Sequence, residues 1–191
     1  MSTYLRALAE EATIIRGGQL NPDSIEVLRF PKPRFREMRN LVGNGVIAAA
    51  SDTSDGLLAA IYNIANRSRC GFDLELTADL IPDYVARAAR HADVGSEWNL
   101  FFAWGDWSIA AAVPAARLKE FRQICEADHV EYRVLGQMTD SRLFRARLNR
   151  DRMTKVQILR NENFRAVGYN SNLGEHLKYM LTTPIFSHDG D

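Results

Sequence analysis

Residues 46–65 change their hydrophobic period in the middle, and this change constrains what the surrounding chain can fold into. Residues 46–50 form a short apolar run of the kind expected for a buried strand. Beyond Gly56, apolar side chains recur at helical spacing, at Leu57, Leu58, Ile61, Ile64 and Ala65. The sequence therefore predicts a strand that turns into a helix, with residues 51–56 as the connection between them.

This connection carries two carboxylates and a hydroxyl close together, at Asp52, Asp55 and Ser54. Carboxylate oxygens suit Mg²⁺, which takes one or two protein carboxylates and fills its other positions with water and nucleotide phosphates. We therefore interpret Asp52 and Asp55 as candidate metal ligands and Ser54 as a candidate hydrogen-bond partner of a phosphate. The alternative is that Ser54 or Asp55 only caps the following helix, because both residue types are favoured at helix N-termini.

Several short motifs follow one another between residues 30 and 140. They are Phe30-Pro31-Lys32-Pro33-Arg34, the Asp-x-Ser-Asp-Gly-Leu loop that starts at Asp52, Cys70-Gly71-Phe72-Asp73-Leu74-Glu75-Leu76, Gly105-Asp106-Trp107 running on to Val113-Pro114, and Val134-Leu135-Gly136-Gln137-Met138-Thr139. In this order and spacing they resemble the C-terminal domain of the AIR synthase-related (PurM-like) superfamily, and the thiamine-monophosphate kinases most closely. The resemblance implies a three-layer sandwich with a mixed β-sheet.

The resemblance also assigns roles to the acidic connection. In the kinases the first Asp and the second Asp of this loop contact magnesium and the Ser contacts ATP, which implies these roles for Asp52, Asp55 and Ser54 and makes ATP and Mg²⁺ the expected cofactors. No catalytic residue beyond the metal ligands is implied.

Two departures from the family pattern change what we expect. The kinases follow Gly-Asp-Tyr with a Glu that contacts the phosphate acceptor, whereas Ser108 stands at that position here, in an acceptor pocket that the resemblance places at Asp106, Trp107 and Ser108. Superfamily members also carry an N-terminal domain that holds most of the metal ions and ATP phosphates, and nothing like it precedes Pro31. We therefore expect that domain on a separate chain that assembles with this one into an oligomer.

Composition excludes several other classes of function. The chain has 191 residues, with 24 basic and 24 acidic side chains, so its formal net charge is zero. A net charge of zero gives no overall electrostatic attraction to nucleic acid or to an anionic membrane. Cys70 and Cys125 lack metal-ligand spacing and are expected to be reduced, mostly buried thiols. No apolar stretch approaches the ~20 residues of a membrane helix, and residues 1–15 lack a signal-peptide core. We expect a cytoplasmic protein.

The remaining sequence predicts an α+β or layered α/β domain, because strands and helices alternate along it. We expect an N-terminal helix and linker over residues 1–29 and the family domain over residues 30–191. Within that domain we expect helices at residues 81–91, 115–127 and 173–181, strands at residues 100–103 and 107–113, and a frayed end at residues 187–191. Trp98, Trp104 and Trp107 are interpreted either as a stacking platform for a planar ligand or as core side chains.

From about residue 141 the chain becomes a basic, β-rich extension. Cationic side chains alternate there with apolar ones, at Arg142, Arg145, Arg147, Arg150, Arg152, Lys155 and Arg160. This pattern predicts a β-hairpin with one basic face, which is either a solvated face, an anion-binding wall or a subunit contact.

Two hypotheses follow for function. The first is ATP- and Mg²⁺-dependent phosphoryl transfer to a small molecule, or its ATP-driven activation, with the active site completed by the separate chain. The second is a non-catalytic binding or regulatory subunit that retains the fold.

Overall fold

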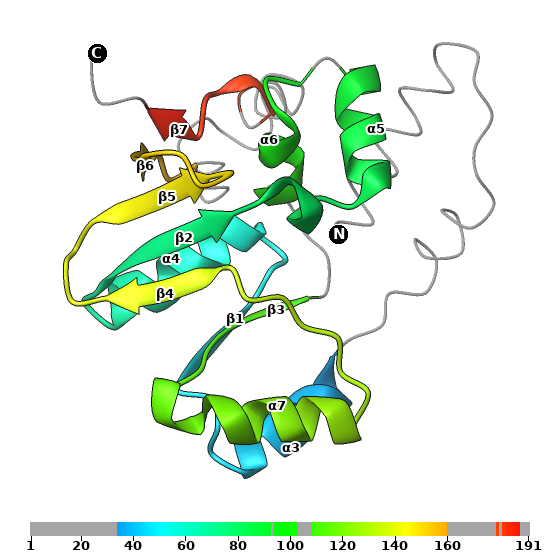
Figure 1. Ribbon diagram of the computed structural model, residues 1–191, viewed down its shortest axis with the longest axis vertical. Helices are drawn as coiled ribbons and strands as arrows, with labels where there is room; N and C mark the ends of the chain where they lie inside the picture. The colour runs from blue at the N-terminus through cyan, green and yellow to red at the C-terminus, as the bar shows by residue number, and fades with distance from the viewer. Residues whose placement is uncertain (1–33, 93, 103–107, 160–178, 180, 188–191) are drawn as a thin grey trace, which may run out of the picture.

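A mixed five-stranded sheet forms the centre of the computed structural model, which describes residues 34–92, 94–102, 108–159, 179 and 181–187 (Figure 1). The strand order is β4-β2-β5-β6-β7, in which β2 and β5 run parallel and the other neighbours antiparallel. The strands are β2 (Gly71–Leu76), β4 (Gly136–Thr139), β5 (Phe144–Leu148), β6 (Met153–Val156) and β7 (Phe186–Ser187). The predicted mixed sheet is thus confirmed.

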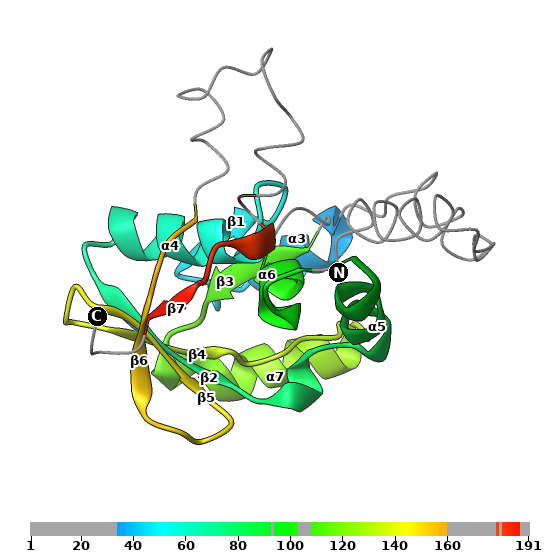
Figure 2. The same cartoon turned by 90° about the horizontal axis from the view of Figure 1, so that it is seen from above.

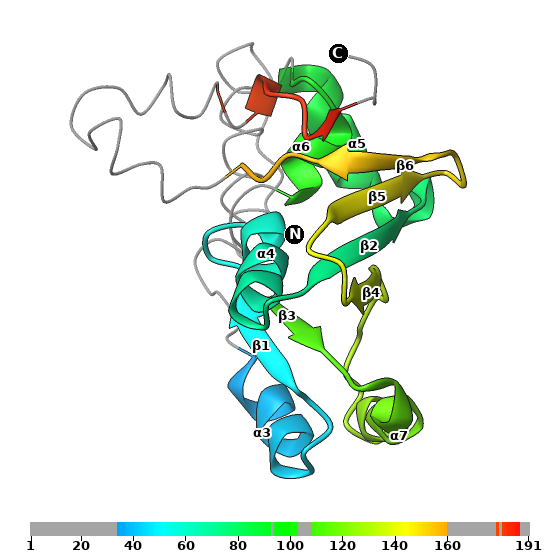
Figure 3. The same cartoon turned by 90° about the vertical axis from the view of Figure 1, so that its left-hand side faces the viewer.

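Helices cover one face of this sheet. They are α4 (Leu57–Arg67), α5 (Asp83–Ala92) and α6 (Glu97–Phe102), with the short 3₁₀ turn η1 (Ala78–Leu80) leading into α5. Figures 2 and 3 show α4 on one side of β2 and β5. Alternate residues of β2 point toward the helices, so Phe72, Leu74 and Leu76 are buried with Ala65 of α4. The result is the layered α+β fold that the sequence predicts.

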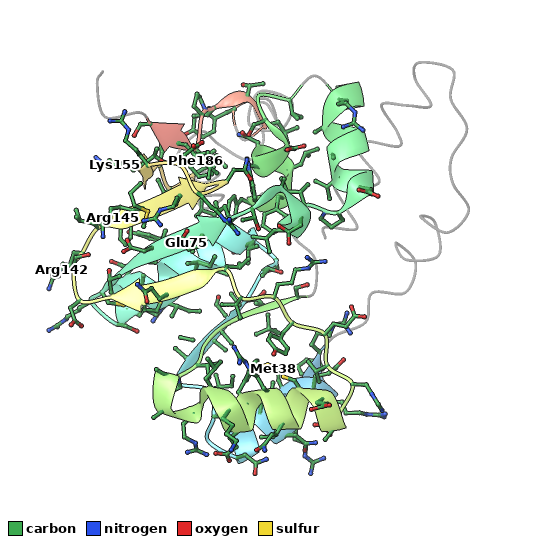
Figure 4. All side chains as sticks on the ribbon, in the orientation of Figure 1. Met38, Glu75, Arg142, Arg145, Lys155 and Phe186 are labelled. Atoms are coloured by element: carbon green, nitrogen blue, oxygen red, sulfur yellow. The ribbon has the colours of Figure 1, made fainter. Side chains whose placement is uncertain are left out.

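A second unit is built on a two-stranded ribbon of β1 (Ala49–Asp52) and β3 (Ile109–Ala112). Beside it lie α3 (Phe35–Gly43) and α7 (Leu118–Ala127), the latter preceded by the 3₁₀ turn η2 (Ala115–Arg117). The two helices enclose a small core of Leu41, Val46, Phe121 and Cys125, with Met38 partly buried against it (Figure 4). Both cysteines are free, Cys125 buried and Cys70 partly exposed.

Three local predictions are wrong. The first strand begins at Ala49 rather than at residue 46, because Val46 packs into the small core after a turn at Gly45, whose φ is 65°. Residues 100–102 are helical, not extended: Ser96 accepts a hydrogen bond from the Asn99 amide through its Oγ at 3.3 Å and so starts α6. At the other end, Ser187 lies in β7 rather than in a frayed tail.

Several predicted segments lie outside the described residues. These are the N-terminal helix and linker, nearly all of the closing helix at residues 173–181, and residues 188–191. In the part of the chain that the structure describes, no helix combines the length and the apolar character needed to cross a bilayer. The basic segment after residue 141 contributes β5 and β6 to the same sheet as β2.

Candidate functional site

The acidic loop lies where the β1–β3 ribbon meets the start of α4 (Figure 3). In the antiparallel register Ala49 faces Ala112 and Asp52 faces Ile109, so Asp52 is the last residue of β1. Helix α4 begins at Leu57. The loop proper is therefore Thr53, Ser54, Asp55 and Gly56, and it follows a strand whose partner starts next to Ser108.

Thr53 anchors this loop, a role that the sequence pattern does not indicate. Its side chain is buried, with 4% of the residue exposed. Its backbone N–H and its hydroxyl Oγ1 both donate to the carbonyl oxygen of Ser108, at 3.1 Å each. Its own carbonyl accepts a hydrogen bond from the Gly56 amide at 2.8 Å. The sequence itself offers only a β-branched hydroxyl residue between two polar ones, Asp52 and Ser54.

Gly56 occupies the N-cap position of α4, which bears on the capping alternative. Its φ of 106° lies in a region that favours glycine, and its carbonyl accepts the Ala60 amide at 3.0 Å. Ser54 Oγ donates to Asp52 Oδ2 instead of capping the helix. Asp55 precedes the N-cap position. The capping alternative is therefore wrong for Ser54, and Asp55 does not hold the N-cap position.

The donor set of the loop fits a hard cation. Asp52, Ser54 and Asp55 are all exposed, and within the described ranges Asp52 takes part in no ion pair. The hydroxyl of Ser54 donates to one of the two carboxylate oxygens of Asp52 and so orients the carboxylate. Two carboxylates match the number that Mg²⁺ takes from a protein when water and phosphate supply the rest. Among the described residues no group of three acidic, His or Cys side chains gathers.

The predicted acceptor residues are only partly described. Ser108 is half-buried and its backbone is bonded to Thr53, so the structure brings it beside the acidic loop. Asp106 and Trp107 lie outside the described residues, as does Trp104. Trp98 is a core side chain: it is 7% exposed, and its ring centroid lies 5.5 Å from that of Phe101.

A separate hollow of about 320 Å³ lies on the sheet face opposite α4. It is lined by Asp73, Glu75, Gly136, Gln137, Arg147 and Met153. These residues belong to β2, β4, β5 and β6, whereas the acidic loop follows β1. The hollow is thus distinct from the site that the sequence indicates.

Comparison with solved structures places this fold among known ones. The chain is similar to tt0281 from Thermus thermophilus, with a TM-score of 0.60 and 19% identity over 78% of this chain and 47% of that one. It is similar to thiamine-monophosphate kinase from Stenotrophomonas maltophilia, with a TM-score of 0.57 and 21% identity over 74% of this chain and 46% of that one. It is also similar to a chain of the HypE-HypF complex, with a TM-score of 0.56 and 15% identity over 68% of this chain and 42% of that one.

These likenesses show the fold, and the chain spans about half the length of the structures it matches. No curated protein matches its sequence. A family model does match, over residues 7–149, and its description is AIR synthase related protein, C-terminal domain. This match covers most of the chain and includes the acidic loop, β2 and β4. The chain therefore belongs to the AIR synthase related family, of which it carries the C-terminal domain.

Proposed function

We propose that this chain supplies one half of an ATP- and Mg²⁺-dependent active site that transfers a phosphoryl group to a small molecule or activates it with ATP. The observation that carries the proposal is the exposed loop in which Asp52 and Asp55 flank the buried anchor Thr53. Membership of the AIR synthase related family, an ATP-utilising enzyme family, supports it. Asp52 and Asp55 would hold magnesium, and Ser54 would donate a hydrogen bond to a phosphate oxygen.

The bound ion would neutralise phosphate charge, which together with positioning is the main requirement of phosphoryl transfer. The protein contributes position, because Asp52 is fixed at the end of a strand. Ser54 donates its single hydroxyl proton to Asp52 in this structure and would turn it to the phosphate when nucleotide binds. Ser108 lies next to the loop through its bond to Thr53. A small acceptor bound near Ser108 would thus lie beside the metal.

The rest of the site is assigned to a separate chain that carries the nucleotide-binding domain. In the family that the sequence resembles, an N-terminal domain holds most of the metal ions and the ATP phosphates, so that chain would supply the further ligands. The similarity to a chain of the HypE-HypF complex is compatible with a protein that works in an assembly. The alternative function is a non-catalytic binding or regulatory subunit, in which the loop holds no metal.

The test is to purify the protein with the products of neighbouring genes and to measure ATP turnover by the assembly. Asp52→Asn and Asp55→Asn each remove a charge with little change of volume, and each is expected to abolish turnover. Asp140→Asn, which changes an exposed carboxylate in the turn after β4, is the matched control and is expected to leave it unchanged. All three should keep the free energy of unfolding within about 0.5 kcal/mol of the wild type. Full turnover in both loop variants would exclude the metal role.

The chain by itself is expected to bind Mg-ATP weakly or not at all and to hydrolyse none. Robust ATPase activity of the isolated chain that disappears in Asp55→Ala would instead show that the site is complete within one chain. An assembly that binds nucleotide but never turns it over, with or without the loop carboxylates, would favour the regulatory alternative.

A further inference from the structure

Thr53 is one of two polar residues that are buried in the described part of the chain; the other is Asn99. Asn99 connects α6 to the segment before β7, because its side-chain amide donates to the carbonyl of Thr183 at 2.8 Å. Thr53 lies instead between the two candidate metal ligands. A valine would fill the same volume without a hydroxyl to satisfy, so the buried hydroxyl calls for an explanation.

The bonds of Thr53 connect three parts of the site. Its N–H donates the last hydrogen bond of the β1–β3 ladder, and its hydroxyl adds a second donor to the same oxygen of Ser108. Its carbonyl then accepts from Gly56, the N-cap residue of α4. One residue thereby fixes the end of the strand, the start of the helix and the backbone at Ser108.

We propose that Thr53 is a positioning residue that holds the acidic loop in the conformation in which Asp52 and Asp55 bind a divalent ion. This inference rests on the proposed function, since it concerns the same ion. The apparent affinity of an ion for a loop falls in proportion to the fraction of molecules that hold the binding conformation. Without the hydroxyl, the last rung has one donor instead of two, and the loop opens more often.

The experiment compares Thr53→Val, which loses the hydroxyl and keeps the branched shape, with Thr53→Ser, which keeps the hydroxyl. Thr154→Val is the matched control. Thr154 lies in β6, and its Oγ1 also donates to a backbone carbonyl, that of Ala146 in β5, at 3.2 Å. Hydrogen exchange of the Gly56 amide reports opening of the loop. Titration with Mn²⁺ alone, followed by paramagnetic broadening of the same amide, reports ion binding by the full chain.

We expect Thr53→Val to raise Gly56 exchange by about three- to tenfold, the effect of one lost hydrogen bond, and to weaken Mn²⁺ binding by a similar factor. Thr53→Ser should restore both values, and Thr154→Val should change neither. If wild-type Mn²⁺ broadening exists and Thr53→Val leaves it unchanged, this inference is wrong while the proposed metal role stands. If Mn²⁺ broadens no loop amide in the wild type, or if Asp52→Asn leaves the broadening intact, this inference is wrong, whereas the metal role in the assembly is still decided by the turnover of the Asp52→Asn and Asp55→Asn variants.

Discussion

Arg145 and Asp73 form a two-pronged ion pair across the parallel strands β5 and β2. Arg145 Nε donates to Asp73 Oδ1 at 2.8 Å, and a terminal nitrogen of the same guanidinium donates to Oδ2 at 2.9 Å. The hydrogen bond and the charge of Asp73 raise the pKa of Arg145. Arg147 and Glu75, two residues further along both strands, approach only to 3.6 Å. Two cations of the predicted basic face are therefore paired with carboxylates on β2.

These two pairs differ enough in geometry and exposure to predict different effects on stability. Asp73 is 13% exposed, whereas Glu75 is 53% exposed. Asp73→Asn should lower the free energy of unfolding measurably, because it weakens a bidentate pair at a half-buried position. Glu75→Gln should change it by no more than about 0.5 kcal/mol. Denaturant unfolding of both variants measures this; equal effects would show that the close geometry of the first pair contributes nothing.

Any side chain at Gly56 is predicted to strain the backbone. Because its φ of 106° is rarely adopted by other residues, Gly56→Ala should cost about 1–3 kcal/mol of stability. Gly43→Ala is the control: a Cβ at that position would meet no atom within 4 Å, and Gly43 ends α3 in ordinary helical geometry. Thermal unfolding should therefore separate the two variants, and a fully stable Gly56→Ala protein would contradict the conformation of the loop.

The fold around the loop was predictable because local periodicity reports burial there. By resemblance, residues 70–76 match a strand in which apolar and polar residues alternate, and β2 has that pattern, with Phe72, Leu74 and Leu76 buried. The helical spacing after Gly56 predicts α4. The sequence pattern does not indicate helix α6, because its six residues are too few to reveal a period. The hydrogen bond from the Asn99 amide to Ser96 Oγ at its start is a local feature that the structure adds.

Long-range features were beyond reach of the sequence pattern. Strands β2 and β5 pair in parallel, with Phe72 opposite Phe144. The sequence of either strand does not indicate which strand it pairs with. The same holds for the candidate site: the Asp-x-Ser-Asp-Gly-Leu pattern indicates Asp52 and Asp55, but the role of Thr53 depends on a carbonyl at Ser108, far along the chain. Contacts between distant segments had to come from the structure.

Cys125 is predicted to make stability depend on alkaline pH. Burial, and after it the charge of Asp128, raises the pKa of its thiol in the folded state. The unfolded thiol ionises first, near its ordinary pKa of about 8.5. The stability that Cys125 contributes is thus fully present below that pKa and is lost as the pH rises toward the folded pKa. Unfolding of the wild type and of Cys125→Ala across this range measures it: the variant should show a shallower alkaline decline, and parallel curves would contradict the prediction.

The acceptor of the proposed reaction is predicted from Ser108, which by the resemblance corresponds to a Glu in the kinases. A Glu would hydrogen-bond or charge-pair with a cationic or donor-rich acceptor such as thiamine phosphate, whereas Ser offers one short hydroxyl and no charge. We therefore expect the assembled enzyme to prefer an acceptor that is neutral or anionic at this point, and to use thiamine phosphate poorly. Phosphorylated and carboxylated metabolites, tested in parallel with thiamine phosphate, measure this preference.

Two variants sharpen that test. Ser108→Glu should shift the preference toward cationic acceptors, because it restores the missing charge beside the acidic loop. Trp107→Ala should raise the KM for the preferred acceptor if the indole stacks on it, since base- or ring-stacking on an aromatic face contributes binding energy. The wild-type assembly could instead phosphorylate thiamine phosphate efficiently, at a rate that Trp107→Ala does not change. The acceptor would then bind away from residues 106–108, and Ser108 would have no role in specificity.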